Sequence, residues 1–331
     1  MTNHQPDPGV VKSIQDAYQI LCVSHISPDG DAIGSLTAMG QILHYLEKKV
    51  TLALQDDVPP ELMNLPYAHS VIGADDVGDT YDLIICLDSS SSDRMGRVYR
   101  PSHHRHIPVA VIDHHITNTK FGTVNWVEPE CAATCQMLVY LTDMLQIPLE
   151  EPLARSLLTG LVTDTHCFRT PNTTPDVLAV ATRLVNEGAD LAKITDQTLN
   201  RRPYNVLQLW SQVLPTMQLE DGVIWTVVHQ DNLDQIGNPN ADSQLSSVLI
   251  TADEADISAV FTERIGDDGY ARVECSFRAK PGYDVGSVAF RLGGGGHPPA
   301  SGCTIDGNIH EIVPKVVAEL QQARKQKKQQ V

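Results

Sequence analysis

Four short apolar runs, each ending in an aspartate or a histidine, recur through the first half of the chain and restrict its fold. The runs, with the polar residues that follow them, are 20–23 (Ser24 and His25), 83–87 (Asp88), 109–112 (Asp113, His114 and His115) and 160–163 (Asp164). Runs of this length are typical of buried strands. Between them, as in residues 32–47, apolar residues recur at three- and four-residue spacing, which indicates helices.

This alternation predicts an α/β fold, with a doubly wound, mostly parallel sheet. In such a sheet the ligand crevice lies outside the carboxyl ends of the strands, so the polar residues that follow the runs converge there. Several unpaired carboxylates at one place repel one another unless cations neutralise them. A metal site is the simplest explanation, although Pro28-Asp29-Gly30 on its own is typical of an ordinary turn.

The length and the charge of the chain limit its function. A length of 331 residues is enough for two domains, and 42% hydrophobic residues allow a substantial core. The formal net charge of -17 argues against binding of long duplex nucleic acid, which depends on many Lys and Arg contacts with phosphate. A small anionic substrate held by metals is compatible with this charge.

The sequence carries no sign of secretion or of membrane insertion. Its seven cysteines are odd in number, and some of them, such as Cys22 and Cys86, lie in predicted strands, so we expect no disulfide framework. The polar start of the chain has no basic segment followed by an apolar run, and no stretch approaches about 18 uninterrupted apolar residues. We therefore expect a soluble, cytoplasmic protein with no membrane partner.

Three parts are expected along the chain: a catalytic domain over 10–190, a helical linker over 190–215 and a smaller α+β domain over 216–325. In the last part, residues 257–265 and 270–277 predict a hairpin across the turn 266–269. We interpret residues 1–9 as a disordered lead-in and the histidine-rich residues 102–106 as a solvated loop.

A run of four glycines, 293–296, precedes His297 in this last part. Such a run alone is typical of a flexible loop, and it is not a P-loop because no Gly-Lys-Ser/Thr follows. Between a helix and a strand, however, it allows a nucleotide phosphate to approach bare backbone N–H groups.

Together these motifs resemble those of the DHH phosphoesterase superfamily. The motifs of its catalytic domain match as His25-x-x-x-Asp29-x-Asp31, Asp88, Asp113-His114-His115 and Asp164, in the family's order. Residues 293–302 look like the signature of the DHH-associated domain. The length is similar to that of one branch, the bifunctional oligoribonucleases and 3′-phosphoadenosine 5′-phosphate phosphatases (nanoRNases).

The resemblance implies two divalent cations, with Mn²⁺ preferred and Mg²⁺ as the alternative, because carboxylate and imidazole ligands suit these ions. Two such cations about 3.5 to 4 Å apart can activate a water for attack on phosphorus. The implied ligands are His25, Asp29 and Asp88 for one cation, and Asp31, Asp88, His114 and Asp164 for the other, with Asp88 as the bridge.

The resemblance also implies roles for residues that bind no metal. His115 would face the substrate as a hydrogen-bond or proton donor, and Asp113 would orient His114 or His115. Arg suits the far phosphate because its guanidinium forks onto phosphate oxygens. The residues of the associated domain that would bind this phosphate or the base are Arg278, Gly293, Gly294, Gly295, Gly296 and His297.

The expected activity is hydrolysis of short RNA or linear dinucleotides, with removal of a phosphate from 3′-phosphoadenosine 5′-phosphate as a second activity. A cyclic-dinucleotide phosphodiesterase, a manganese-dependent inorganic pyrophosphatase and a nucleotide-sensing module without hydrolysis are the alternatives. The family commonly has Thr-Gly after Asp164, whereas this chain has Thr165-His166, which leaves the effect of His166 on the pocket open. The sequence also leaves open whether two chains form a homodimer.

Overall fold

The computed structural model describes residues 4–237, 244–266 and 269–326. The chain divides into two compact units, Met1–Arg201 and Arg202–Val331, and each unit contains one six-stranded sheet. Within the described ranges, no helix has the length and apolar character that a membrane crossing requires.

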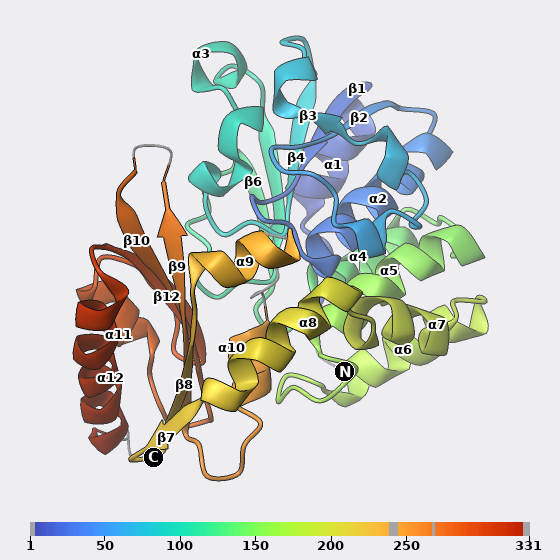
Figure 1. Ribbon diagram of the computed structural model, residues 1–331. Helices are drawn as coiled ribbons and strands as arrows, with labels where there is room; N and C mark the ends of the chain where they lie inside the picture. The colour runs from blue at the N-terminus through green and yellow to red at the C-terminus, as the bar shows by residue number, and fades with distance from the viewer. Residues whose placement is uncertain (1–3, 238–243, 267–268, 327–331) are drawn as a thin grey trace. The chain divides into compact units, whose positions relative to one another are not determined.

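The first unit is built on a sheet in which all neighbouring strands are parallel (Figure 1). The strands lie in the order β3-β2-β1-β4-β5-β6, so the order reverses between β1 and β4. This arrangement confirms the predicted doubly wound fold, whose ligand crevice lies at the point of reversal. The strands are β1 (Gln19–Val23), β2 (Lys49–Leu54), β3 (Ile72–Gly73), β4 (Leu83–Leu87), β5 (Val109–Asp113) and β6 (Val124–Val127).

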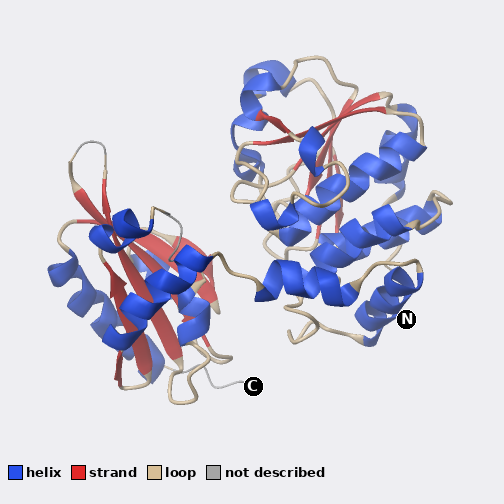
Figure 2. Cartoon of the chain, turned by 45° about the vertical axis from the view of Figure 1, so that its right-hand side comes forward, coloured by secondary structure: helices blue, strands red, loops and turns tan. Residues whose placement is uncertain are grey.

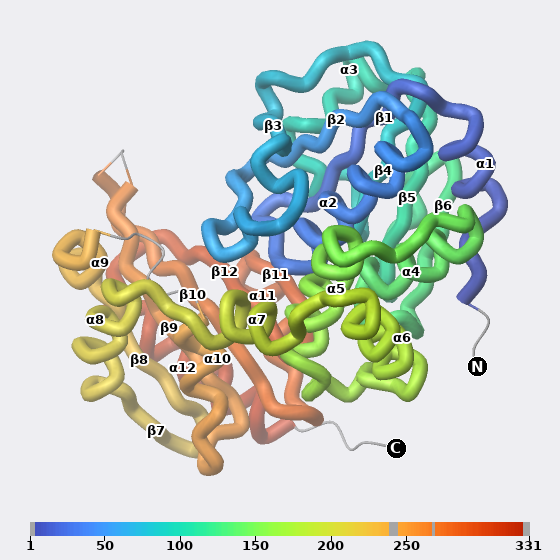
Figure 3. The backbone as a smooth tube through the Cα atoms, turned by 90° about the vertical axis from the view of Figure 1, so that its right-hand side faces the viewer, coloured from blue at the N-terminus to red at the C-terminus, as the bar shows by residue number. Residues whose placement is uncertain are grey.

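Both faces of this sheet are apolar and covered, as is typical of parallel sheets. On one face, α2, α4 and α5 lie against one another (Figure 3), and Ile20 and Cys22 of β1 point into the core that they form. On the other face, Leu21 and Val23 pack with the 3₁₀ segment Ser92–Val98. The helices of this unit are α1 (Pro8–Asp16), α2 (Gly30–Tyr45), α3 (Pro101–His104), α4 (Thr134–Met144), α5 (Glu151–Asp164), α6 (Pro175–Asn186) and α7 (Leu191–Thr195).

Two glycines let α2 and α5 approach each other closely. A Cβ atom added to Gly34 of α2 would lie 2.7 Å from the backbone oxygen of Ser156 in α5. A Cβ atom added to Gly160 of α5 would overlap Sγ of Cys135 and Oδ1 of Asp31. Because the added atom has no room, only glycine allows this approach, which brings the start of α2 beside the end of α5.

The second unit contains a mixed sheet with helices on both faces (Figure 2), which confirms the predicted α+β class. Its strand order is β11-β12-β10-β9-β8-β7, and β8 and β9 form the parallel pair among antiparallel neighbours. The strands are β7 (Gln218–Glu220), β8 (Val223–Val228), β9 (Ile257–Ile265), β10 (Ala271–Ala279), β11 (Gly295–His297) and β12 (Ala300–Asp306). Helices α8 (Tyr204–Val213), α9 (Gln230–Ile236) and α10 (Leu245–Leu249) cover one face, and α11 (Gly286–Arg291) and α12 (Ile309–Lys325) cover the other.

Two predictions of local structure concerned residues 160–163, expected to form a strand, and the hairpin of the last part of the chain. Residues 160–163 do not form a strand, because they continue the helical pattern of the preceding residues, and Asp164 is the last residue of α5. The predicted hairpin is present as β9 and β10, although residues 267 and 268 of its turn lie outside the described ranges.

Two histidine-containing segments also differ from expectation. Residues 1–3 of the lead-in lie outside the described ranges, but His4 is buried, and α1 begins at Pro8, where Oδ1 of Asp7 accepts hydrogen bonds from the first backbone N–H groups. His104, expected in a solvated loop, is buried in α3. Its Nε2 lies 3.1 Å from the backbone oxygen of Gly78, and this hydrogen bond explains how the ring is tolerated inside the protein.

The close contact of α2 and α5 gives a testable prediction for Gly160→Ala. The added methyl group overlaps Cys135 and Asp31, and we expect the free energy of unfolding to fall by about 1 to 3 kcal/mol, as in other overpacked cores. This loss outweighs the gain of about 1 kcal/mol in helix propensity. The measurement is urea-induced unfolding followed by circular dichroism.

The matched control is Gly40→Ala in α2, because a Cβ atom there meets the end of the flexible Leu52 side chain. We expect the control to be at least as stable as the wild type. Equal stability of the Gly160→Ala variant and the wild type would contradict the role given to Gly160.

Candidate metal centre

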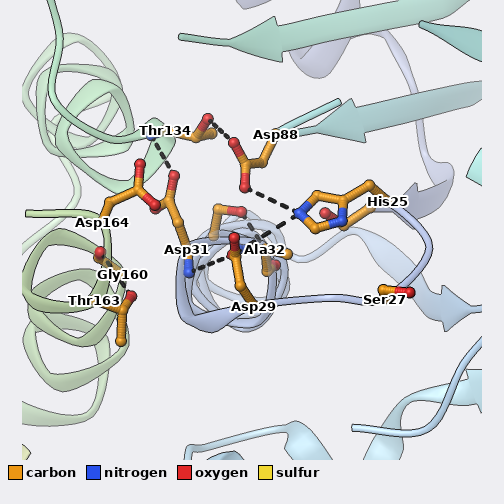
Figure 4. A network of polar contacts seen from close by, with 12 residues as sticks. His25, Ser27, Asp29, Asp31, Ala32, Asp88, Thr134, Gly160, Thr163 and Asp164 are labelled. Atoms are coloured by element: carbon orange, nitrogen blue, oxygen red, sulfur yellow. Dashed lines mark hydrogen bonds and ion pairs between the residues drawn. The ribbon is translucent and has the colours of Figure 1, made fainter. Parts of the chain in front are cut away.

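Seven polar side chains meet where the strand order reverses, at the carboxyl ends of β1, β4 and β5 and at the neighbouring ends of α2 and α5. Figure 4 shows five of them, His25, Asp29, Asp31, Asp88 and Asp164. The seven residues are His25, Asp29, Asp31, Asp88, His114, His115 and Asp164. The six residues expected to bind metal are therefore brought together in space, and His115 lies with them.

His25 follows β1 and faces two carboxylates. Its Nε2 lies 3.5 Å from Oδ2 of Asp88 and 3.8 Å from Oδ1 of Asp29. Its Nδ1 lies 2.9 Å from the backbone oxygen of Ile26. When Nδ1–H donates to that oxygen, Nε2 keeps its lone pair free for a cation.

Asp29 has a second role as the residue that caps α2. Its Oδ1 accepts hydrogen bonds of 3.0 Å from the backbone N–H groups of Asp31 and Ala32. Asp is among the preferred residues for this position because these N–H groups have no partner within the helix. The cap fixes the start of α2 and thereby the position of Asp31.

Asp88 lies at the middle of the site and is held by an unusual backbone conformation. Its φ of 54° lies in the left-handed region, which Asp tolerates better than most residues. Its backbone N–H donates to the oxygen of Ile112 at 3.0 Å. Oδ2 faces His25, while Oδ1 lies 3.5 Å from Nε2 of His114. The two oxygens of one carboxylate thus face different histidines.

His114 joins the second half of the site. Its Nε2 lies 3.2 Å from Oδ2 of Asp164 and 4.0 Å from Oδ2 of Asp31. Asp31 and Asp88 are almost completely buried, whereas the side chain of Asp164 is 24% exposed. The exposed side of Asp164 leaves this half of the site accessible from solvent.

The start of α4 supports two of the carboxylates, a role that the sequence analysis missed. The backbone N–H groups of Thr134 and Cys135 donate to Oδ2 and Oδ1 of Asp31 at 2.6 and 2.9 Å. The hydroxyl of Thr134 donates to Oδ1 of Asp88 at 3.1 Å. Free N–H groups at a helix start attract anions, and the apolar residues over 132–145 recur at helical spacing, so the start of this pattern was a signal that could have identified this support.

A hydrogen-bonded chain holds His115. Nδ1 of His115 lies 2.7 Å from Oδ1 of Asp113, and Oδ2 of Asp113 accepts from Nδ2 of Asn118 at 2.6 Å. Asp113 is fully buried, whereas the side chain of His115 is 32% exposed. Asp113 thus orients His115, with its Nδ1 3.6 Å from Oδ1 of Asp88.

Arg94 is a second residue that the sequence analysis missed. Its Nη2 lies 3.0 Å from Nδ1 of His25, and its backbone oxygen accepts from the N–H of Ile26 at 2.8 Å. It lies in the segment after β4, and no apolar run or spaced motif marks it in the sequence.

The carboxylates and imidazoles change one another's pKa values. Burial lowers the pKa of His25, but Asp29 and Asp88 outweigh this effect and raise it to about 10. Burial raises the pKa of Asp88, but His114 and His25 outweigh this effect and hold it well below its usual range. Burial raises the pKa of Asp31 well above its usual range, and the nearby charges of Asp88 and Asp164 raise it further.

When no metal is bound, protons on the imidazoles supply part of the positive charge that the carboxylates need. Burial lowers the pKa of His114, but Asp164 and Asp88 outweigh this effect and raise it well above its usual range. Burial likewise lowers the pKa of His115, which Asp113 and Asp88 raise above its usual value. Protonated imidazoles stabilise the buried carboxylates, because like charges cannot all ionise without compensation.

The donor set fits two divalent cations. The site contains three groups of three residues, and within each group the ligand atoms lie within 4.8 Å of one another. The groups are His25, Asp29 and Asp88; Asp31, His114 and Asp164; and Asp88, His114 and His115. Oxygen and imidazole donors suit Mn²⁺, Mg²⁺ or Zn²⁺, and the four aspartates balance the charge of two such ions. Asp88 and His114 each belong to two groups, so these two residues connect the two halves of the site.

The expected substrate-binding residues lie in the second unit. Arg278 of β10 pairs with Ala300 of β12, which in turn pairs with His297 of β11, so the three residues form one row across the sheet. Burial lowers the pKa of Arg278, and among the described residues no carboxylate pairs with it. Residues of one row share a face of a sheet, so Arg278 and His297 lie on the same face.

The glycine run is only partly a loop. Gly293 and Gly294 form a turn after α11, whereas Gly295 and Gly296 belong to β11. A Cβ atom added to Gly294 would overlap the backbone of Gly302, and Gly296 has a φ of 131°. Gly294 therefore requires glycine for lack of space and Gly296 for its backbone conformation, independent of any ligand.

Known proteins resemble this chain over nearly its whole length. Residues 19–161 match the DHH family, N-terminal domain, and residues 222–326 match the DHHA1 domain. The bifunctional oligoribonuclease and PAP phosphatase NrnA of Thermus thermophilus is 34% identical over 298 residues, which cover 90% of this chain and 87% of that protein. The protein of the same name from Bacillus subtilis is 28% identical over 305 residues, with 89% and 92% covered.

A solved structure of an exopolyphosphatase-related protein from Bacteroides fragilis has the same fold. It superposes with a TM-score of 0.87 at 22% identity, and the match covers 97% of each chain. The match to the DHH family, N-terminal domain, over residues 19–161 includes six of the seven residues of the metal centre. The seventh, Asp164, lies three residues beyond this range. The chain therefore belongs to the DHH phosphoesterase family, with a DHH domain followed by a DHHA1 domain.

Proposed function

We propose that this protein hydrolyses short oligoribonucleotides or linear dinucleotides, and that it also removes a phosphate from 3′-phosphoadenosine 5′-phosphate. The observation that carries the proposal is the position of Asp88, whose two oxygens face the two halves of a site with six further donors. The proteins called oligoribonuclease and PAP phosphatase that are similar to this chain support the choice of substrate.

The residues of the site would hold two divalent cations, Mn²⁺ by preference. His25, Asp29 and Asp88 would bind one, and the residues of the second half, Asp31, Asp88, His114 and Asp164, would bind the other. When bound, the cations supply Lewis-acid activation of the phosphoryl group and of the attacking water. Asp31, fixed by two backbone N–H groups of α4, would keep its oxygens in place through the reaction.

His115 is the residue that we assign to proton transfer. Asp113 holds its Nδ1, which leaves Nε2 as the atom that can donate to a leaving oxygen or to a phosphate. Asp113 and Asp88 raise the pKa of His115 above its usual value, which favours the protonated form that a general acid requires. About a third of the His115 side chain is exposed, so a substrate can reach this residue from solvent.

The second unit would bind the far end of the substrate. Arg278 has no carboxylate partner among the described residues, so its charge is available to a phosphate. His297, on the same face of the sheet, and the backbone of Gly293–Gly296 would contact the base or this phosphate. The net charge of -17 fits a short substrate and not a long duplex.

The cysteines fit action in a reducing compartment, and we propose the cytoplasm. All seven are free thiols. Disulfides are rare in proteins of the cytosol and common in secreted ones.

The proposed function is tested with a substrate panel and Mn²⁺. The panel contains a 5′-phosphorylated dinucleotide, a five-nucleotide RNA, 3′-phosphoadenosine 5′-phosphate, a cyclic dinucleotide and pyrophosphate. We expect turnover of the first three and a loss of at least about a hundredfold in kcat for Asp88→Asn, which keeps the backbone conformation but removes the bridging charge. Product release is measured by chromatography.

The control variant is Asp75→Asn, because Asp75 is an exposed aspartate whose partner is the surface residue Arg97. This variant should retain wild-type kcat. Retained activity of a folded Asp88→Asn variant would refute the bridging role, and exclusive turnover of pyrophosphate would refute the nucleotide substrate.

Arg278→Gln tests the role of the second unit. Loss of a charged hydrogen bond to phosphate costs about 1.5 to 3 kcal/mol, so we expect KM for the dinucleotide to rise about ten- to a hundredfold. Hydrolysis of bis(p-nitrophenyl) phosphate, which lacks the far phosphate, should change by less than about twofold. Arg272→Gln, at an exposed position of the same strand, is the control. Equal losses on both substrates would contradict the assignment.

Metal affinity should depend on pH in a defined direction. His25 has a pKa of about 10 in the metal-free site, so its ring is protonated at neutral pH and must lose a proton to bind a cation. The apparent affinity for Mn²⁺ should therefore rise between about pH 6 and pH 9, by up to about tenfold per unit for each proton released. Isothermal titration calorimetry in buffers of different ionisation enthalpy measures the affinity for Mn²⁺ and the number of protons released on binding. An affinity that does not change with pH would contradict this description of His25.

A further inference from the structure

A second group of metal-ligating side chains lies outside the metal centre. It consists of His4, in the segment before α1, and Glu128 and Glu130, in the loop after β6. Each residue offers one ligand atom, and the three atoms lie within 4.8 Å of one another. None of the three residues belongs to the groups that form the metal centre.

His4 is the most buried member of this group, and packing fixes its ring. It is 8% exposed, and its ring stacks on Tyr140 of α4 with the ring centroids 5.8 Å apart. The ring points toward Glu128, since Nδ1 lies 3.5 Å from Oε2. Among the described residues, neither ring nitrogen of His4 makes a hydrogen bond. The partner of this ring is the carboxylate of Glu128, so Nδ1 is directed into the group.

The separation of 3.5 Å fits two ligands of one cation better than it fits a hydrogen bond. Good hydrogen bonds between nitrogen and oxygen are about 2.7 to 3.2 Å long. A cation with ligands at about 2.1 Å places neighbouring ligand atoms roughly 3 to 3.5 Å apart. The distance between Nδ1 of His4 and Oε2 of Glu128 therefore allows both atoms to bind one ion.

We propose that His4, Glu128 and Glu130 bind a divalent transition-metal cation, with Zn²⁺ as the best fit. One imidazole and two carboxylates are donors that Zn²⁺ accepts, and their net charge of two negative units balances the ion. Glu130 is exposed, which gives the cation a path from solvent and leaves a coordination position for water.

The site would tie the start of the chain to the loop that leads into α4. The backbone N–H of Glu128 donates to the oxygen of Asp113, and that of Cys131 donates to the oxygen of Glu128, both at 3.0 Å. Three residues further on, Thr134 holds Asp31 and Asp88 of the metal centre. A cation on Glu128 and Glu130 would thus order the loop that precedes α4, whose first residue holds the two buried aspartates.

The test counts bound zinc in the full chain, which carries no polyhistidine tag. The protein is stripped with a chelator, dialysed against low micromolar Zn²⁺ and analysed by mass spectrometry for zinc and by absorbance for protein. We expect Glu128→Gln/Glu130→Gln to bind one zinc ion fewer per chain than the wild type. Because the result is a difference, ions taken up by the metal centre cancel, so the outcome does not depend on the proposed function.

Two further variants keep the result interpretable. His4→Ala alters the start of the chain and no strand, and it should lose the same ion even if the double variant folds poorly by circular dichroism. Glu187→Gln, at an exposed glutamate after α6, should bind as much zinc as the wild type. Equal zinc content in the wild type, His4→Ala and a folded double variant would overturn the proposal.

Discussion

The structure of the first unit depends on the concentration of negative charge at the point where the strand order reverses. Asp31 and Asp88 are buried almost completely, and in water-poor surroundings such charges are costly unless something compensates them. Imidazoles, the N–H groups at the start of α4 and the hydroxyl of Thr134 supply part of this compensation. Cations on the candidate ligands would complete it, so the same cost that opposes folding would favour metal binding.

The packing of three helices makes this concentration of charge possible. Asp31 comes from α2, its backbone partners come from α4, and Asp164 comes from the end of α5. Glycine at position 160 removes the side chain that would hold α2 and α5 apart. The parallel sheet contributes the remaining ligands from the ends of its strands. The strands and the helices therefore position different candidate ligands, and the site forms only when the sheet and the helix packing are both in place.

The sequence predicted the fold class and the meeting of the polar residues that follow β1, β4 and β5, because the ends of parallel strands lie at one edge of a sheet, although Asp164 reaches the site from the end of α5. It did not predict Arg94 or the backbone N–H groups of α4, since their contacts depend on how separate elements pack. Residues 160–163 were misinterpreted because a short apolar run fits both a strand and a buried helix. The burial of His4 and His104 also depends on distant partners that local polarity does not reveal.

One oxygen of Asp29 serves two purposes, since Oδ1 caps α2 and also faces His25. Asparagine could keep the cap but would weaken the bond to a cation, whereas glutamate would keep the charge but lose the short reach that the cap needs. Neither of these conservative replacements would therefore serve both purposes. A cation bound through Asp29 would link the start of α2 thermodynamically to the occupancy of the site, so a change that loosens the first turn of this helix would also change metal affinity.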